Sequence, residues 1–156
     1  MSATILNRDP ALYVRPETLA QERARIFLRT WAFLGPASAV TEPGAYLAAE
    51  IAGLPVVALR GRDGVLRGFR NVCRHRGARL LASGEGTCGL VVCPYHKWSY
   101  DHTGRLVQAP WWGNDPAIVP EDWPLTPIHL ATWRGLLFAA VDPETALEDQ
   151  LGDLPA

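Results

Sequence analysis

The chain has 156 residues, a formal net charge of −1 and a hydrophobic fraction of 48%, and six of its residues are Trp. This composition is typical of one globular domain, large enough to bury roughly two-thirds of the surface that its unfolded chain exposes. The balanced charge argues against the broad basic surface of a nucleic-acid-binding protein. No apolar run reaches the roughly 18 residues of a membrane span, and the first residues do not resemble a signal peptide, so we expect a cytoplasmic protein.

The first predicted element is an amphipathic helix of about three turns over residues 17–30. Leu19, Ile26 and Phe27 lie on one face of such a helix, and the charged residues lie largely on the other. Pro16 fits its first turn, because a backbone N–H at that position has no partner within the helix. We therefore expect one helix before the rest of the fold.

From Trp31 onward, short apolar runs alternate with turn residues. The connections 61–64 and 101–104 contain the Asp and Gly that hairpin turns favour. The expected strands cover residues 44–51, 54–60, 65–72, 90–92, 98–100, 105–108, 128–133 and 136–141. Residues 110–127 hold five of the 13 prolines, which predicts an extended loop packed by Trp side chains. The pattern indicates a mainly β fold, an antiparallel β barrel or sandwich that follows the single helix.

Two short loops, each after an expected strand, carry residues of the types that bind metals. The first contains Cys73 and His75, and after 17 further residues the second contains Cys93 and His96. A tetrahedral zinc site could use these four side chains, although zinc modules generally pair two cysteines in one loop. The mixture of Cys and His in each loop favours a binuclear centre, with Cys73 and Cys93 on one iron and His75 and His96 on the other.

With Cys73 and Cys93 assigned as ligands, only Cys88 remains, so no disulfide can form without disrupting the metal site. We interpret it as an ordinary small residue that leads into a strand. A redox or ligand role for it is the alternative.

Residues 71–80, NVCRHRGARL, and residues 93–100, CPYHKWSY, resemble the two cluster loops of a Rieske domain. They are most similar to the form found at the N-terminus of the large (alpha) subunit of Rieske non-haem iron ring-hydroxylating oxygenases, and the likeness covers almost the whole chain. The resemblance implies a Rieske-type fold with two cluster-binding loops and a [2Fe–2S] cluster.

The sequence departs from that family in two ways. Lys97 stands where the family usually has Gly after the second His, which leaves the substrate class open. Downstream of the second loop the only histidines are His102 and His129, so the chain offers no mononuclear iron site of two His and one carboxylate. We therefore expect an N-terminal segment and helix (1–30), a Rieske domain (31–142) and a stub (143–156) that leads toward a catalytic domain outside this chain.

The resemblance implies electron transfer, in which a ferredoxin or flavin-dependent reductase is the donor and a mononuclear-iron catalytic domain or protein is the acceptor. The alternatives are a stand-alone Rieske ferredoxin and a zinc-stabilised binding module. We expect no nucleic-acid or membrane partner, a possible homo-oligomer as in the family, and no hydroxylation by the chain alone. Basic residues at the loops favour an acidic donor or are simply solvated charges; they are Arg70, Arg74, Arg76, Arg79 and Lys97.

The loop residues also predict a low reduction potential. Respiratory Rieske proteins carry a Ser where Trp98 stands, and they carry disulfide-forming cysteines where Ala78 and Tyr95 stand. Without these groups fewer hydrogen bonds reach the sulfurs, although Tyr100 could still donate one. We expect His102 to be a solvated turn residue and His129 to point to solvent, and we expect the remaining Trp side chains to serve packing.

Overall fold

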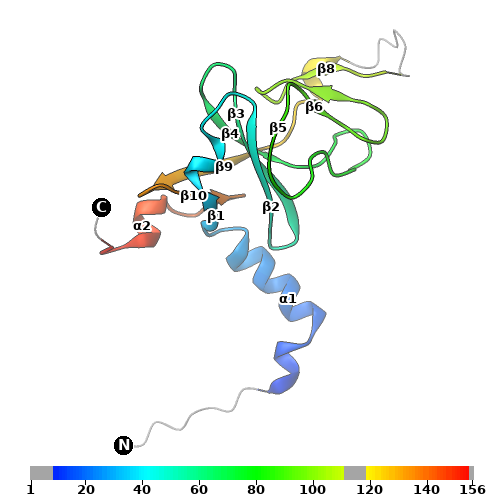
Figure 1. The fold of residues 1–156 in the computed structure, drawn as a ribbon. Helices are drawn as coiled ribbons and strands as arrows, with labels where there is room; N and C mark the ends of the chain where they lie inside the picture. Colours follow the sequence, from blue (N-terminus) through cyan, green and yellow to red (C-terminus); the bar gives the residue numbers. More distant parts are fainter. Residues whose placement is uncertain (1–8, 111–118, 155–156) are drawn as a thin grey trace, which may run out of the picture.

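The computed structural model describes residues 9–110 and 119–154 of the 156-residue chain. The strands are β1 (Ala32–Pro36), β2 (Ala45–Ile51), β3 (Leu54–Arg60), β4 (Leu66–Arg70), β5 (Gly84–Thr87), β6 (Val91–Val92), β7 (Ser99–Tyr100), β8 (Leu106–Gln108), β9 (Pro127–Trp133) and β10 (Leu136–Ala140). Within the described residues they form a seven-stranded sheet in the order β1-β10-β9-β4-β3-β2-β5 and a three-stranded sheet in the order β6-β7-β8 (Figure 1). All pairs are antiparallel. The fold is therefore mainly β with curled antiparallel sheets, as predicted.

The strand β3, which pairs with β2 and β4, is buried on both faces, which explains why its sequence is almost wholly apolar. Val57 and Leu59 point toward the small sheet and join the core cluster that contains the cysteines of both loops. Val56 and Ala58 point the other way, into two smaller clusters shared with β10. Because successive side chains of a strand alternate between the faces of a sheet, a strand covered on both sides needs apolar residues at every position.

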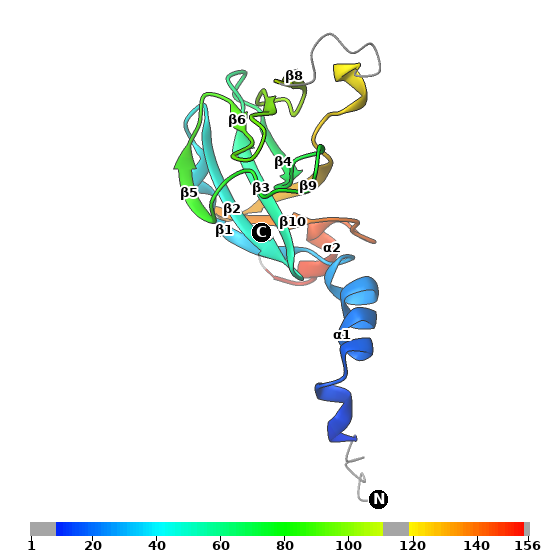
Figure 2. The ribbon, with the colours of Figure 1, turned by 90° about the vertical axis from the view of Figure 1, so that its right-hand side faces the viewer.

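The predicted N-terminal helix is present and covers 12 residues. It consists of α1 (Pro16–Glu22) and a π-helical continuation (Arg23–Phe27), and the short 3-10 turn Pro10–Tyr13 precedes it. Neither helical part buries a residue, and Leu19, Ile26 and Phe27 are 44%, 50% and 43% exposed. Both views show α1 at the end of the molecule opposite to β6 and β8 (Figure 1, Figure 2).

The C-terminal segment folds back onto the start of β1 and contains a short helix, α2 (Leu147–Leu151), that was not predicted. The Gln150 side chain accepts a hydrogen bond from the Trp31 N–H (2.7 Å) and donates one to the Trp31 carbonyl (2.9 Å). The Trp31 indole N–H donates to the carbonyl of Thr145 (2.9 Å), and Arg29 pairs with Glu144 (2.8 Å). Residues 144–150 are therefore held against residues 29–31.

The loop predicted over residues 110–127 lies partly outside the described residues, which resume at Val119. The described part contains a 3-10 turn, Pro120–Asp122, followed by Trp123. Trp123 packs against the core edge-to-face with Trp98, at 5.4 Å between ring centroids. None of the helices in the described part of the chain is long and apolar enough to cross a membrane.

Candidate metal centre

The two loops that carry Cys73, His75, Cys93 and His96 share one backbone construction. The Cys73 N–H donates to the carbonyl of Ala78 (2.8 Å), and the Gly77 N–H donates back to the carbonyl of Cys73 (2.9 Å). The second loop repeats both bonds, from Cys93 to Trp98 (2.8 Å) and from Lys97 to Cys93 (3.1 Å). Each loop thus closes around its cysteine in the same way.

Both loops turn at the residue four positions after the cysteine, in the left-handed backbone region. Gly77 has a φ of 69° and Lys97 a φ of 61°. A left-handed conformation costs a residue with a side chain roughly 1–2 kcal/mol more than it costs Gly. Lys97, which stands where the family usually has Gly, therefore adopts the same turn as Gly77 but with a strained backbone.

The two cysteines lie inside the molecule. Cys73 and Cys93 are 3% and 1% exposed and belong to the core cluster between the sheets. Burial, together with the adjacent Cys93 thiol, raises the pKa of Cys73. A thiol in such a place ionises readily only when a metal supplies the compensating positive charge.

Tyr100 adds a hydrogen bond at the buried sulfur, as the sequence suggested. Its hydroxyl lies 3.5 Å from Sγ of Cys73 and accepts a hydrogen bond from the Arg74 N–H at 3.1 Å. Because that N–H can only donate, the hydroxyl proton is free to point at the sulfur. Burial and the contact with Cys73 raise the pKa of Tyr100, so the hydroxyl keeps this proton.

The two histidines lie nearer the surface and face each other. The rings of His75 and His96 are 4.7 Å apart between centroids, and both residues are half-buried. The Nδ1 atom of His96 is buried and has no hydrogen-bond partner among the described residues. Burial, and then the nearby His96 and Arg76, lower the pKa of His75, which favours the neutral imidazole that binds metals.

The four side chains thus form an inner thiol pair and an outer imidazole pair. Among the described residues, no three His, Cys, Asp or Glu side chains are placed to hold a single metal ion. Two pairs, one of sulfur and one of nitrogen, with an orphaned imidazole nitrogen in the outer pair, fit a centre of two irons.

Two further residues support the loops, and the sequence reasoning did not assign them these roles. Asn71 is 1% exposed; its amide donates to the Leu81 carbonyl (2.8 Å) and accepts from the Leu81 N–H (2.9 Å), which closes the first loop at its base. Trp98 is fully buried and stacks on His75 of the other loop, at 4.9 Å with 9° between the rings. The position of Asn71 two residues before Cys73 was a usable signal; the stacking of Trp98 was not readable from sequence.

The basic residues near the loops do not all contribute to one face. Arg79 pairs with Glu50 and donates to the Ser83 hydroxyl (2.8 Å), and Arg70 is a half-buried residue of β4. Three others are exposed and, within the described residues, form no ion pair; they are Arg74, Arg76 and Lys97.

Outside the loops, one prediction was wrong. His102 is only 6% exposed, and its Nε2 lies 3.0 Å from the carbonyl oxygen of Cys88. The ring is covered because the turn packs against Gly44, where a Cβ would lie 3.5 Å from Cε1 of His102. His129 is exposed, as expected. Cys88 is half-buried and free, and burial raises its pKa.

A family model described as the Rieske [2Fe–2S] domain matches residues 30–124. The chain belongs to the Rieske [2Fe–2S] domain family. Such a domain holds a [2Fe–2S] cluster in which two His replace two Cys on one iron, and the two side-chain pairs of this chain suit that arrangement.

Similarity to larger proteins extends beyond the Rieske model. The chain is 34% identical over 147 residues to the alpha subunit of chlorobenzene dioxygenase from Cupriavidus sp. (strain PS12), covering 93% of the chain and 33% of that protein. It is 36% identical over 148 residues to the oxygenase subunit of glycine betaine monooxygenase from Chromohalobacter salexigens, covering 91% of the chain and 32% of that protein.

Solved structures agree with these relatives. Naphthalene 1,2-dioxygenase from Rhodococcus sp. superimposes with a TM-score of 0.80 and 38% identity, covering 90% of this chain and 33% of that one. This Rieske domain therefore spans about a third of the length of the proteins that it resembles, and it is homologous to alpha subunits of Rieske oxygenases across most of its own length.

Proposed function

We propose that the chain is the electron-transfer domain of a Rieske oxygenase alpha subunit. Cys73 and Cys93 would hold one iron of the cluster, and His75 and His96 the other. The observation that carries the proposal is the placement of these side chains, with the thiols in the core and the imidazoles toward the surface. A cluster of this type, when bound, carries one electron at a time.

The chain's own residues would shape how that electron enters and leaves. Tyr100 holds a hydroxyl proton against Sγ of Cys73, which favours the more negative, reduced form. Trp98 fixes the plane of His75 by stacking on it. The imidazoles are half-buried whereas the thiols are buried, so the electron would enter and leave through the imidazoles.

We further propose a donor and an acceptor. An acidic ferredoxin or flavin-dependent reductase would meet the face around Arg74, Arg76 and Lys97, and the acceptor would be a mononuclear iron site in a catalytic domain beyond residues 31–142. The relatives are oxygenase subunits of which this chain covers about a third, which supports a separate catalytic domain. In this proposal residues 1–30 are an N-terminal segment and residues 143–156 are the connection to that domain. Hydroxylation by the chain alone is not expected.

Cysteine-to-serine variants test the assignment of ligands. We expect iron and acid-labile sulfide in equal amounts in the reconstituted wild-type chain, and an electron paramagnetic resonance signal after reduction. The Cys93→Ser variant should lose the bound iron and sulfide and also the resonance signal. The matched control is Cys88→Ser, because Cys88 is the remaining cysteine and lies outside the two loops; it should retain the full cluster content. Retention of the cluster by Cys93→Ser, or its loss from Cys88→Ser, would overturn the ligand set.

A further inference from the structure

A continuous series of ring contacts links both proposed histidine ligands to a residue outside the cluster loops. The rings of His75 and His96 are 4.7 Å apart between centroids, and Trp98 stacks on His75 at 4.9 Å with 9° between the planes. Trp123 then meets Trp98 edge-to-face, at 5.4 Å and 84°. His75 is thus connected, through Trp98, to a segment that lies well beyond both loops in the sequence.

Trp98 is enclosed by its neighbours, so its plane depends on Trp123. Trp98 is 0% exposed, and Trp123 is a half-buried residue that packs against the same core cluster. An edge-to-face contact between two aromatic rings contributes roughly 0.5–1.5 kcal/mol beyond the area that it buries. Because protein interiors are close-packed, removal of the Trp123 ring would leave a space into which Trp98 can tilt.

Backbone hydrogen bonds fix the segment that carries Trp123. The Trp123 N–H donates to the carbonyl of Pro120 (3.2 Å), and the Leu125 N–H donates to the carbonyl of Gly104 (2.8 Å). The Leu125 side chain is 2% exposed and belongs to the core cluster that contains Trp98. Trp123 is therefore held by the chain on both sides of its own position.

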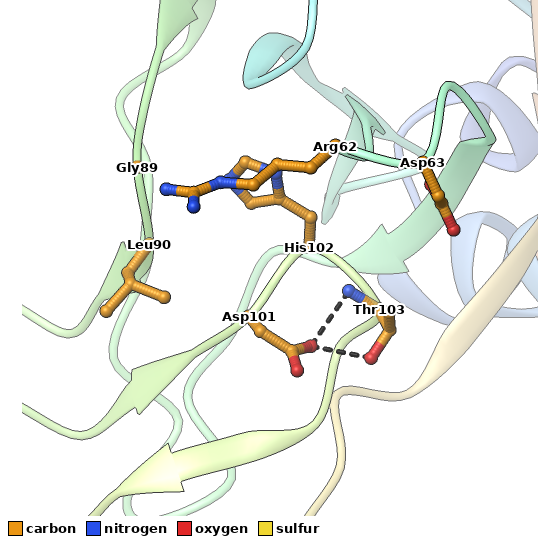
Figure 3. Close-up of a pocket in the computed structure, with 7 residues that line it drawn as sticks. All are labelled: Arg62, Asp63, Gly89, Leu90, Asp101, His102 and Thr103. Carbon is orange, nitrogen blue, oxygen red and sulfur yellow. Dashed lines mark hydrogen bonds between the residues drawn. The ribbon is translucent and has the colours of Figure 1, made fainter.

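The carbonyl of Gly104 belongs to the turn between β7 and β8, which side-chain hydrogen bonds close. Asp101 accepts one from the Thr103 N–H (2.8 Å) and one from the Thr103 hydroxyl (2.6 Å), as Figure 3 shows. Trp98 directly precedes β7, so it begins the hairpin whose turn anchors the Trp123 segment. One hairpin and one backbone bond thus set the placement of the two Trp rings relative to each other.

The face of His75 that Trp98 covers is shielded from water. His75 as a whole is half-buried, and its ring is nearly coplanar with the indole that stacks on it. Solvent exposure is one of the properties that set the reduction potential of an iron–sulfur centre. A tilted Trp98 would uncover this face and would also allow the imidazole to turn.

We propose that Trp123 is a positioning residue of the cluster site. By holding Trp98 flat against His75, it fixes the orientation of that imidazole and keeps water from one of its faces. The effect on the potential rests on the proposed function, whereas the packing of the three rings does not. A purely structural Trp123 would affect the free energy of unfolding and leave His75 unchanged.

Nuclear magnetic resonance of the full chain before cluster reconstitution tests the packing. Stacking on an indole moves the ring protons of His75 upfield. Trp123→Leu and Trp123→Met keep an apolar side chain without a ring and should lose most of this displacement, whereas Trp123→Phe should keep it. The matched control is Trp133→Leu, because Trp133 is also half-buried and its ring contacts the Arg134 guanidinium (5.6 Å); it should leave the His75 signals in place.

A redox titration of the reconstituted chain tests the effect on the centre. In Trp123→Leu the ratio of reduced to oxidised protein at a fixed solution potential should rise about threefold, which corresponds to about 30 mV for a one-electron couple. The ratio rises because more water reaches His75 and stabilises the reduced form, which carries the additional negative charge. Trp123→Phe and Trp133→Leu should keep the wild-type potential.

Each result decides one part of the proposal. His75 signals that stay in place in both ringless variants would overturn it, and so would an equal displacement in Trp133→Leu. Displaced signals together with an unchanged potential would overturn the effect on the centre. A wild-type chain that assembles no cluster would contradict the proposed function, and the resonance result would still decide whether Trp123 positions His75.

Discussion

Lys97 occupies the position in the second loop that Gly77 occupies in the first, and the two residues share a left-handed backbone. No atom of the described residues lies within 4 Å of a Cβ built on Gly77, so a side chain at that position meets only the strain of the backbone. The two positions therefore form a natural comparison, in which the same conformation is held once by Gly and once by a residue that resists it.

We predict that Lys97→Gly raises the free energy of unfolding by up to about 1 kcal/mol, because it removes that strain at some cost in chain entropy. Gly77→Ala should lower it by about 1 kcal/mol. Urea unfolding followed by circular dichroism, at matched cluster occupancy, measures both. A destabilised Lys97→Gly variant beside a neutral Gly77→Ala variant would show that the loops do not turn as described.

At Tyr100 the hydroxyl contact with Cys73 predicts a measurable change in potential. We expect the wild-type centre near the low end of the Rieske range, at about −150 mV. Tyr100→Phe removes a hydrogen bond worth on the order of 1 kcal/mol to the reduced form, so the potential should fall by about 40 mV.

A redox titration followed by electron paramagnetic resonance measures this shift. Tyr95→Phe is the control, since Tyr95 lies in the second loop, is 60% exposed and keeps its ring contact with His96 as Phe. An unchanged or higher potential in Tyr100→Phe would exclude a role for the hydroxyl at the sulfur.

At the scale of elements, the sequence predicted eight of the ten described strands and missed the two at the edges of the large sheet. β1 and β5 lie at the two edges of the large sheet. Their sequences, AFLGP and GEGT, contain Gly and Pro and lack the alternation of a half-buried strand, because an edge strand with one partner tolerates both.

The meeting of the two Cys/His loops could be predicted because their signal is local, in the spacing of Cys and His within each loop. The burial of His102 was not predictable, because it depends on Gly44 and Cys88 from distant parts of the chain. The stacking of Trp98 on His75 joins the two loops and is likewise a property of the folded chain. Local chemistry was readable from sequence, and contacts between loops were not.

The turn between β3 and β4 predicts a dependence of stability on pH. Asp63 accepts hydrogen bonds from Arg67 (2.9 and 2.7 Å) and from the Val65 N–H (3.1 Å). The side-chain bond with Arg67, and then that from Val65, lower the pKa of Asp63 from 3.8 to about 2. A pKa that is lower in the folded state adds stability above the unfolded value and loses it as the pH falls through the folded value.

The advantage of wild type over Asp63→Asn in unfolding free energy should therefore be full at neutral pH and fade between about pH 4 and pH 2. Urea unfolding of both proteins at several pH values tests this. A difference that stays constant down to pH 2 would contradict the assignment of the pair.

At the scale of the whole molecule, exposed positive charge lies beside the proposed histidine ligands. Arg74 and Arg76 flank His75 in the first loop, Lys97 follows His96 in the second, and all three are exposed. Opposite charge on a partner would speed its encounter with this face, an effect that salt screens.

We predict that the double variant Arg74→Ala, Arg76→Ala slows reduction by an acidic ferredoxin about tenfold at low salt, and that the difference shrinks as salt is added. The rate is measured by stopped-flow absorbance of the cluster. The matched control is the double variant Arg15→Ala, Arg25→Ala, which removes two charges from the N-terminal helical segment. The control should be reduced at the wild-type rate. Unchanged reduction of the loop variant at low salt would exclude this face as the docking surface.

The proposed function requires two irons with different ligands, one held by Cys73 and Cys93 and the other by His75 and His96. Mössbauer spectroscopy of the iron-57-labelled chain tests it most directly, because it resolves irons with different ligands. We predict two sites of equal area, one with sulfur ligands only and one with sulfur and nitrogen ligands. A single type of iron site, or a chain that takes up zinc in preference to iron and sulfide, would contradict the account.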